Sequence, residues 1–132
     1  MRAKHDEAWC YSILREMRWP KRIACPHCGE ERVTTHTKSL STPRRRYLCL
    51  ACRHTFSDLT ATPLARTNLP LGKWFQSLLL VADGGLSTSE LAKAIGVKWE
   101  TAAHVQRTVG TALSRPGFFW RLREALRENP HD

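Results

Sequence analysis

The sequence lacks long apolar segments. Its longest uninterrupted aliphatic run is LLLVA at residues 78–82, far short of the roughly 18 residues that would indicate a membrane-spanning helix. The N-terminal stretch MRAKHDEAWCYS contains no apolar signal-peptide core and carries acidic residues early. These two absences argue against a spanning or secreted protein, and predict a soluble cytoplasmic protein with no membrane partner.

Acidic side chains are also scarce. The 132 residues contain 12 Asp and Glu against 21 Lys and Arg, for a formal net charge of +9. A cationic surface of this size favours a polyanionic partner, and nucleic acid is the first candidate. We therefore expect double-stranded DNA as the partner and association with the nucleoid.

The cysteines are few but regularly spaced, at positions 10, 25, 28, 49 and 52. The last four form two Cys-x2-Cys pairs separated by 20 residues, a spacing typical of zinc ribbons. Each pair can direct two thiolates at one ion, and two pairs complete the tetrahedral shell of zinc. Structural disulfides are disfavoured in a reducing cytoplasm, and a redox Cys-x-x-Cys would need a βαβ pattern that the chain lacks.

We therefore predict one structural Zn²⁺, held by Cys25, Cys28, Cys49 and Cys52. Four thiolates leave no coordination position for a substrate, so the site would fold the ribbon and not catalyse a reaction. His27 and His54 adjoin the ligands and are expected to be surface or packing residues. Cys10 is expected to be a small buried apolar residue.

The predicted fold class is α+β, a small β zinc ribbon preceded by a short helix and followed by an all-α helix-turn-helix domain. The expected organisation is an N-terminal helix on the ribbon (1–24), the ribbon (25–58), a linker (59–69), a helix-turn-helix domain (70–114) and a C-terminal amphipathic helix (115–132).

The second half has helical periodicity and helix-terminating signals. Asn68 is the predicted N-cap of the first of its helices. Residues 87–90, STSE, form a capping box for the next, and Gly96 provides the turn before a helix over residues 98–113. A DNA-binding helix-turn-helix has this form, although a generic αα-hairpin would need the same apolar residues.

In the DNA-binding interpretation, helix 98–113 is the recognition helix. Its candidate contacts are Lys98, Trp99, Thr101, His104 and Arg107. Trp99 could equally pack against the neighbouring helix. Arg44, Arg45 and Arg46 would suit DNA phosphates, although such a run is as often only a solvated face.

Several of these motifs occur together in one known family. The order is RWP, CPHCG, RRRYLCLACRHTFSDLT, LPLGKWF and STSELAKAIGVKWETA. The arrangement resembles the N-terminal half of zinc-ribbon transposases of bacterial insertion sequences, over residues 7–110. The resemblance implies their fold and DNA binding. Such transposases continue into a domain with three metal-binding carboxylates, whereas the acids at the end of this chain (Glu124, Glu128 and Asp132) lie in or just after one helix.

The preferred hypothesis is a transposase-derived, site-specific DNA-binding protein that regulates transcription without catalysis. The first alternative is a truncated transposase that binds transposon ends or antagonises an intact copy. The second is an adaptor that binds RNA polymerase or another protein, since the three adjacent aromatics in GFFW (117–120) cannot all face one core. Those aromatics could also close the helical domain or form a homodimer interface.

Overall fold

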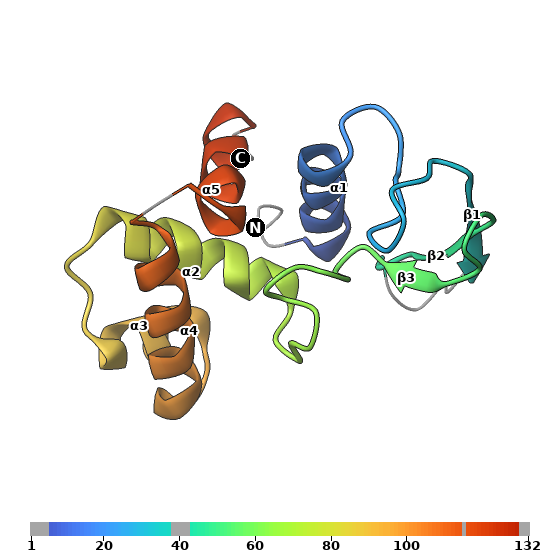
Figure 1. Cartoon of the computed structure of the whole chain (residues 1–132). Coiled ribbons are helices and arrows are strands. Elements are labelled where there is room, and N and C mark those ends of the chain that lie inside the picture. The colour runs from blue at the N-terminus through green and yellow to red at the C-terminus, as the bar shows by residue number, and fades with distance from the viewer. Residues whose placement is uncertain (1–5, 38–42, 115, 130–132) are drawn as a thin grey trace. The chain divides into compact units, whose positions relative to one another are not determined.

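The computed structural model describes residues 6–37, 43–114 and 116–129 (Figure 1). The chain forms two compact units. Residues Glu7–Asn68 make up the ribbon unit, and Leu69–Asp132 together with Asp6 make up the helical unit. The ribbon unit combines a helix with a small sheet, and the helical unit is all-α, so the α+β class is confirmed. Within the described residues, no helix is both long and apolar enough to cross a lipid bilayer.

The ribbon unit contains one helix and three short strands: α1 (Glu7–Arg18), β1 (Val33–Thr37), β2 (Arg46–Cys49) and β3 (Thr55–Ser57). The strands form an antiparallel sheet in the order β1-β2-β3. Val33 pairs with Cys49, and Tyr47 pairs with Phe56. This register places Cys49 at the end of the central strand, where the chain turns into its second cysteine pair.

A small aromatic cluster supports the sheet. Tyr47 and Phe56 are buried together with Cys25 and Cys49. Trp19 packs edge-on against both aromatic rings, with centroid distances of 5.8 Å to Tyr47 and 6.2 Å to Phe56. Two of the four buried residues in this cluster are thiols, so apolar packing alone gives the ribbon only a small core.

The segment 59–69, expected as a linker, contains neither helix nor strand. It nevertheless folds through successive turns, in which the Thr62 hydroxyl donates a hydrogen bond to the carbonyl of Leu59 at 2.6 Å. Leu59 and Leu64 are buried. A solvated spacer would expose such leucines, and residues 59–68 fall within the ribbon unit.

The helical unit contains α2 (Leu71–Asp83), α3 (Thr88–Ile95), α4 (Trp99–Ala112) and α5 (Phe118–Glu128). α4 packs against each of the other three. The prediction that Asn68 caps the first of these helices is wrong. Pro70 occupies the N-cap position, with an extended backbone (φ −56°, ψ 146°) and no side-chain capping bond.

The α3–α4 pair has the helix ends expected from the sequence. At the start of α3, the Ser87 hydroxyl accepts a hydrogen bond from the Glu90 amide, and the Glu90 carboxylate accepts one from the Ser87 amide. The Ser87 amide thereby lowers the pKa of Glu90 below its ordinary value. Gly96 caps the C-terminus of α3, and its φ of 69° lies in the left-handed region that glycine adopts without strain.

Apolar side chains on the facing sides of α3 and α4 form the core of this pair. Its buried members are Leu91, Ala92, Ile95 and Ala102. The small side chain of Ala92 lies in this cluster, as expected for a close helix contact. α5 adds Phe119, whose ring stacks on Trp74 of α2 at a centroid distance of 5.9 Å.

Candidate metal centre and nucleic-acid interface

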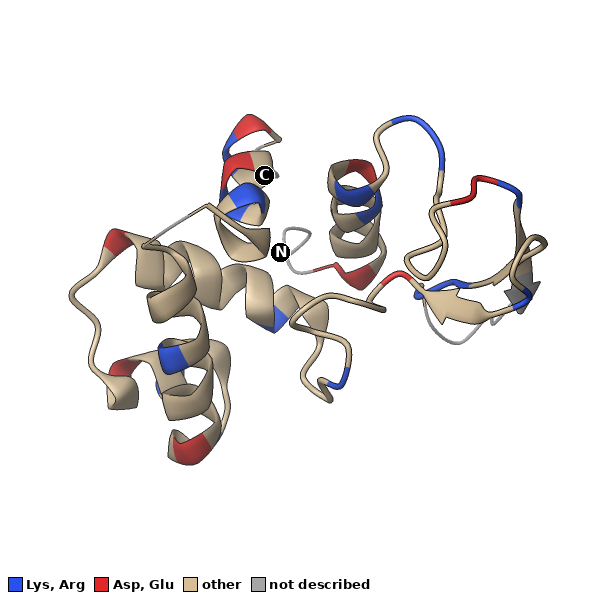
Figure 2. Cartoon of the chain, viewed as in Figure 1, with Lys and Arg blue, Asp and Glu red and all other residues tan. Residues whose placement is uncertain are grey.

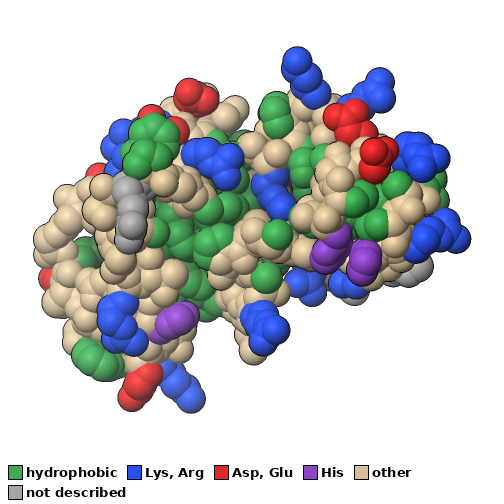
Figure 3. Space-filling view, in the orientation of Figure 1, with side chains coloured by type: hydrophobic (Ala, Val, Ile, Leu, Met, Phe, Trp, Pro, Cys, Tyr) green, Lys and Arg blue, Asp and Glu red, His purple; other side chains and the backbone are tan. Residues whose placement is uncertain are grey.

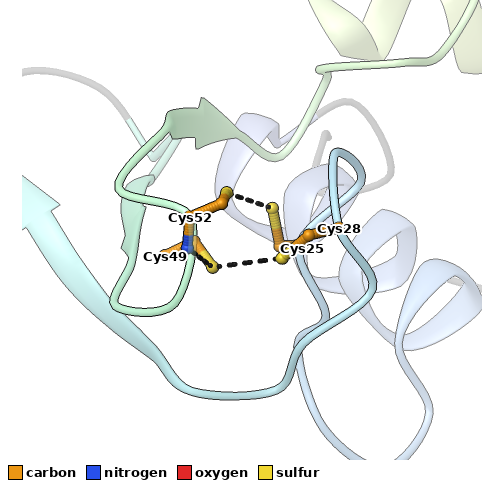
Figure 4. A group of neighbouring side chains, drawn as sticks. All are labelled: Cys25, Cys28, Cys49 and Cys52. Carbon is orange, nitrogen blue, oxygen red and sulfur yellow. Dashed lines mark hydrogen bonds between the residues drawn. The ribbon is translucent and has the colours of Figure 1, made fainter.

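The two Cys-x2-Cys pairs converge on one point (Figure 4). The sulfurs of Cys25, Cys28, Cys49 and Cys52 all lie within 4.8 Å of one another. Cys25 Sγ lies 3.7 Å from Cys52 Sγ, and Cys28 Sγ lies 3.6 Å from Cys49 Sγ. Disulfide sulfurs are about 2.05 Å apart, so these distances exclude disulfide pairing between the two pairs.

The spacing of the sulfurs fits a zinc ion. Four sulfurs at about 2.3 Å from a tetrahedral zinc have edges of about 3.8 Å, close to the two distances in the cluster. The four cysteines therefore form a site for a single structural zinc ion, as the sequence predicts. When bound, the ion would cross-link the loop before β1 to the loop after β2 and leave no open position for a reactant.

The two cysteine loops have matching backbone geometry. In the first, the Gly29 amide donates to the Cys25 carbonyl at 2.8 Å, and in the second the Arg53 amide donates to the Cys49 carbonyl at 2.9 Å. Both residues adopt positive φ, 82° for Gly29 and 67° for Arg53. An arginine thus occupies the left-handed position that a glycine takes in the other loop.

Backbone amides lower the pKa of the cysteine thiols, whereas the neighbouring thiols lower the pKa of Cys49 and raise that of Cys28. The Cys52 amide donates to Cys49 Sγ at 3.5 Å and lowers the pKa of that thiol to about 6. At Cys28, the Glu30 amide lowers the pKa, but desolvation and the other three thiols raise it to about 12. Four adjacent thiols cannot all ionise without a cation between them, so metal binding must release protons.

The two histidines beside the ligands lie outside the four-sulfur cluster. Their exposed rings stack on each other with centroids 4.7 Å apart. His54 Nδ1 also lies 3.3 Å from Cys52 Sγ. His54 therefore contacts the sulfur of one cysteine without belonging to the four-sulfur cluster.

The sequence did not reveal the part played by Asp58, which is fully buried just after β3. Its carboxylate accepts hydrogen bonds from Arg15 Nε at 3.2 Å, from the Tyr47 hydroxyl at 2.5 Å and from the Arg45 amide at 2.8 Å. Arg18 Nη1 donates to the Asp58 carbonyl at 2.7 Å. One residue thus joins α1, β2 and the end of β3.

This network changes the acidity of Tyr47. Desolvation, followed by the hydrogen bond to the Asp58 carboxylate, raises the pKa of Tyr47 to about 12. Arg18 also lies 4.4 Å from the centroid of the Trp19 ring, in a cation–π contact. At the end of α1, Trp19 therefore packs on the sheet that carries the metal site, and Arg18 is bonded just beyond β3.

Polar side chains hold α3 and α4 in place. Lys73 Nζ of α2 donates to the carbonyl of Ile95 at 2.6 Å, where a cation complements the C-terminal dipole of α3. At the other end of α3, Gln106 of α4 accepts from the Thr88 hydroxyl at 2.6 Å and donates to the Leu86 carbonyl at 3.0 Å. Hydrogen bonds at both ends of α3 therefore fix which face of α4 is presented to solvent.

The candidate DNA-contacting residues of α4 do not all point outward. Lys98, Trp99, His104 and Arg107 are exposed, whereas Thr101 is half-buried. His104 also contacts Trp74 edge-on, with centroids 6.4 Å apart. Exposed residues at three- and four-residue intervals form a stripe along α4. Its members are Glu100, His104, Arg107 and Thr111. Two of them, Glu100 and Thr111, were not among the contacts predicted from the sequence.

Most of the positive charge lies in the ribbon unit (Figure 2). Residues 7–68 contain eleven Lys and Arg against five Asp and Glu, whereas residues 69–132 contain eight against six. The candidates Arg44, Arg45 and Arg46 are exposed, at and just before the start of β2. They belong to a different unit from α4, and basic side chains project from several parts of the ribbon surface (Figure 3).

A second basic feature of the ribbon unit is a groove beside β1. Its lining includes Lys21 and Arg22 from the loop after α1, Thr34 and Thr35 from β1, and the acidic Glu31. All five are exposed. The groove offers two cations and two hydroxyl groups, which are common partners of phosphate oxygens.

Comparison with known proteins supports the resemblance seen in the sequence. Residues 5–55 match the family described as the transposase zinc-ribbon domain. The chain is also 31% identical over 106 residues to an uncharacterized protein in transposable element ISH50 of Halobacterium salinarum. That match covers 80% of this chain but only 35% of the relative. No solved structure matches at a significant level. Residues 5–55 are therefore similar to transposase zinc ribbons, and most of the chain is similar to about a third of a transposable-element protein.

Proposed function

We propose that this protein binds a specific site in double-stranded DNA and that α4 reads the bases. The observation that carries the proposal is the exposed stripe of α4, Glu100, His104, Arg107 and Thr111. Side chains of these types hydrogen-bond to base edges in the major groove. Bonds from α2 and between α3 and α4 fix the orientation of this stripe, as sequence readout requires.

The ribbon unit would supply the sequence-independent part of the binding. Its excess of eleven basic over five acidic residues suits the phosphate backbone. We assign phosphate contacts to Arg44, Arg45 and Arg46 and to the groove that contains Lys21 and Arg22. The zinc ion would hold the backbone that carries these charges.

We further propose that the protein acts without catalysis, as a transcriptional regulator associated with the nucleoid. Within the described part of the chain, the four cysteines are the one group of three or more His, Cys, Asp or Glu residues placed to hold a metal. Strand transfer of the transposase type needs carboxylates that hold two metal ions. Asp58 could not join such a group, because its carboxylate is buried and bonded to Arg15 and Tyr47.

Footprinting and gel-shift assays of the zinc-loaded protein on genomic fragments test the proposal. We expect a protected site at moderate salt and, for about six phosphate contacts, a slope near −5 in log K against log salt. Lys98→Ala and Arg107→Ala should abolish selectivity, whereas changes at Arg44–Arg46 should weaken all sequences alike. Arg127→Ala on α5 is the control and should change neither. Absence of any protected site would contradict the proposal.

A second candidate function is binding to transposon ends. The observation that favours it is the homology to a protein of a transposable element. In that case the preferred DNA would be a terminal inverted repeat, and the protein would compete there with an intact transposase. Binding sites mapped across the genome distinguish the two, because a regulator should occupy promoters and an end-binding protein should occupy repeat termini.

An adaptor that binds RNA polymerase, or a homodimer formed through GFFW, receives less support. Phe119 is buried on Trp74, and Phe118 and Trp120 are half-buried. This segment therefore helps to close the helical unit. A pull-down that is insensitive to nuclease would favour the adaptor.

A further inference from the structure

Trp99, the first residue of α4, is far more exposed than its size would suggest. It retains 53% exposure, compared with 43% for Leu50 and 39% for Leu79, the other exposed large apolar residues of the described chain. It is not among the residues that pack on the core of α3 and α4. Within the described residues its ring makes no hydrogen bond and no contact with another ring.

A packing role, which the sequence left open for this residue, therefore does not explain Trp99. Burial would favour so large an apolar ring by an amount proportional to the area removed from water. The surrounding charges indicate what could cover it. Lys98 directly precedes Trp99, and Arg107 lies two turns further on α4, both exposed. Glu100 is the adjacent acid and belongs to the exposed stripe.

We infer that Trp99 contacts the C5-methyl group of a thymine in the major groove, which would make it a specificity-determining residue. This inference rests on the proposed DNA binding by α4. N-terminal residues of a recognition helix meet base edges, and an apolar side chain there reads thymine through its methyl group. The flanking Lys98 would contact the edge of a guanine, and Glu100 can accept a hydrogen bond from a cytosine amino group.

Replacement of thymine by deoxyuridine tests this contact, because it removes the methyl group and leaves the base-pairing edge unchanged. The preferred duplex is first selected from a random library with the zinc-loaded full chain. Each thymine is then replaced singly. We expect one or two positions at which the wild-type affinity falls about fourfold, the effect of one buried methyl group.

Variants assign the effect to Trp99. Trp99→Ala should bind the selected duplex more weakly and no longer distinguish thymine from deoxyuridine at those positions. Trp99→Phe should keep part of the discrimination. Leu79→Ala removes another exposed apolar side chain of the same unit and should leave the deoxyuridine profile unchanged. Because Trp99 is exposed, circular dichroism should show the same helix content in all four proteins.

The outcomes separate this inference from the function on which it rests. A library that yields no preferred sequence overturns both. A selected sequence whose deoxyuridine profile is flat, or is the same in Trp99→Ala, overturns the thymine contact alone. Sedimentation that shows a dimer lost in Trp99→Ala overturns it as well, because a second copy of the chain would then cover the ring.

Discussion

In the ribbon unit, two of the four residues in the buried cluster are Cys25 and Cys49, which are also metal ligands. The core of the helical unit consists instead of side chains such as Leu91, Ile95 and Ala102. The same division applies to charge, because most of the excess positive charge lies in residues 7–68. The ribbon unit thus carries most of the mutually repelling cations and depends on a metal ion for its stability. The helical unit, which would read the bases, is nearly neutral and is stabilised by apolar packing.

Metal removal should therefore affect the two units very differently. A strong chelator should unfold residues 25–58, because structural zinc sites contribute about 10–16 kcal/mol of apparent binding free energy. Amide protons of β1–β3 should lose protection in hydrogen-exchange mass spectrometry, while those of α2–α5 keep theirs. Cys28→Ser should reproduce this loss in the presence of zinc, whereas Cys10→Ala, at a buried thiol outside the cluster, should retain the metal.

Loss of protection in both units on chelation would contradict this contrast. It would mean that the helical unit depends on the ribbon for its stability. Protection retained in both units would contradict the structural role of the metal itself.

The buried ion pair between Arg15 and Asp58 allows a test of whether the metal ion is the only interaction that strongly stabilises the ribbon unit. Asp58→Asn leaves the Arg15 guanidinium without its carboxylate, and loss of one partner of a buried pair costs about 3–5 kcal/mol. Urea unfolding of the zinc-loaded protein, followed by exchange of the β2 amides, should show this loss. Glu124→Gln removes a partly exposed partner of Arg127 on α5 and should change stability by less than about 1 kcal/mol.

If Asp58→Asn were no more costly than Glu124→Gln, the four thiolates alone would determine the stability of the ribbon. A large loss would instead show that the α1–β2–β3 network and the metal stabilise the unit together.

Features set by neighbours in the sequence could be predicted, and features set by distant partners could not. The four-cysteine site follows from two local spacings, and the capping box of α3 lies within four residues. Asp58, in contrast, meets Arg15 across 43 positions and Tyr47 across 11. No local pattern indicates that this aspartate is buried, because the choice depends on how α1 lies against the sheet.

The candidate interface shows the same limit. The position of helix 98–113 could be predicted from its apolar periodicity, but its solvent face also depends on packing against three other helices. Thr101 consequently lies half-buried, and Glu100 and Thr111, which were missed, are exposed. The error at Asn68 has a local cause, because the chain enters α2 through Pro70 in the N-cap position.

The helical unit should respond to loss of apolar volume and not to chelation. Leu91 is fully buried in α3, and truncation of such a leucine to alanine typically costs about 2–5 kcal/mol. Leu91→Ala should lower the thermal midpoint of α2–α5 by the same amount with or without a chelator. Leu79→Ala is the matched control, since Leu79 is exposed and surface substitutions usually change stability by less than about 0.5 kcal/mol. A chelator-dependent effect of Leu91→Ala would indicate coupling between the units.

The smallest effects are expected from substitutions that compare the two cysteine loops within the ribbon unit. Gly29 and Arg53 occupy equivalent left-handed positions with φ of 82° and 67°. A side chain in that region costs about 1–2 kcal/mol, so Gly29→Ala should weaken zinc binding roughly tenfold in competition with a chelator. No atom within 4 Å would obstruct the added methyl group, so the cost would come from the backbone alone. Arg53→Gly removes the same strain, but it increases the freedom of the unfolded chain, and its zinc affinity should equal or exceed that of the wild type. If Arg53→Gly instead lowered the zinc affinity, the arginine side chain would itself stabilise the second loop. The two loops would then share a backbone geometry but differ in the interactions that stabilise it.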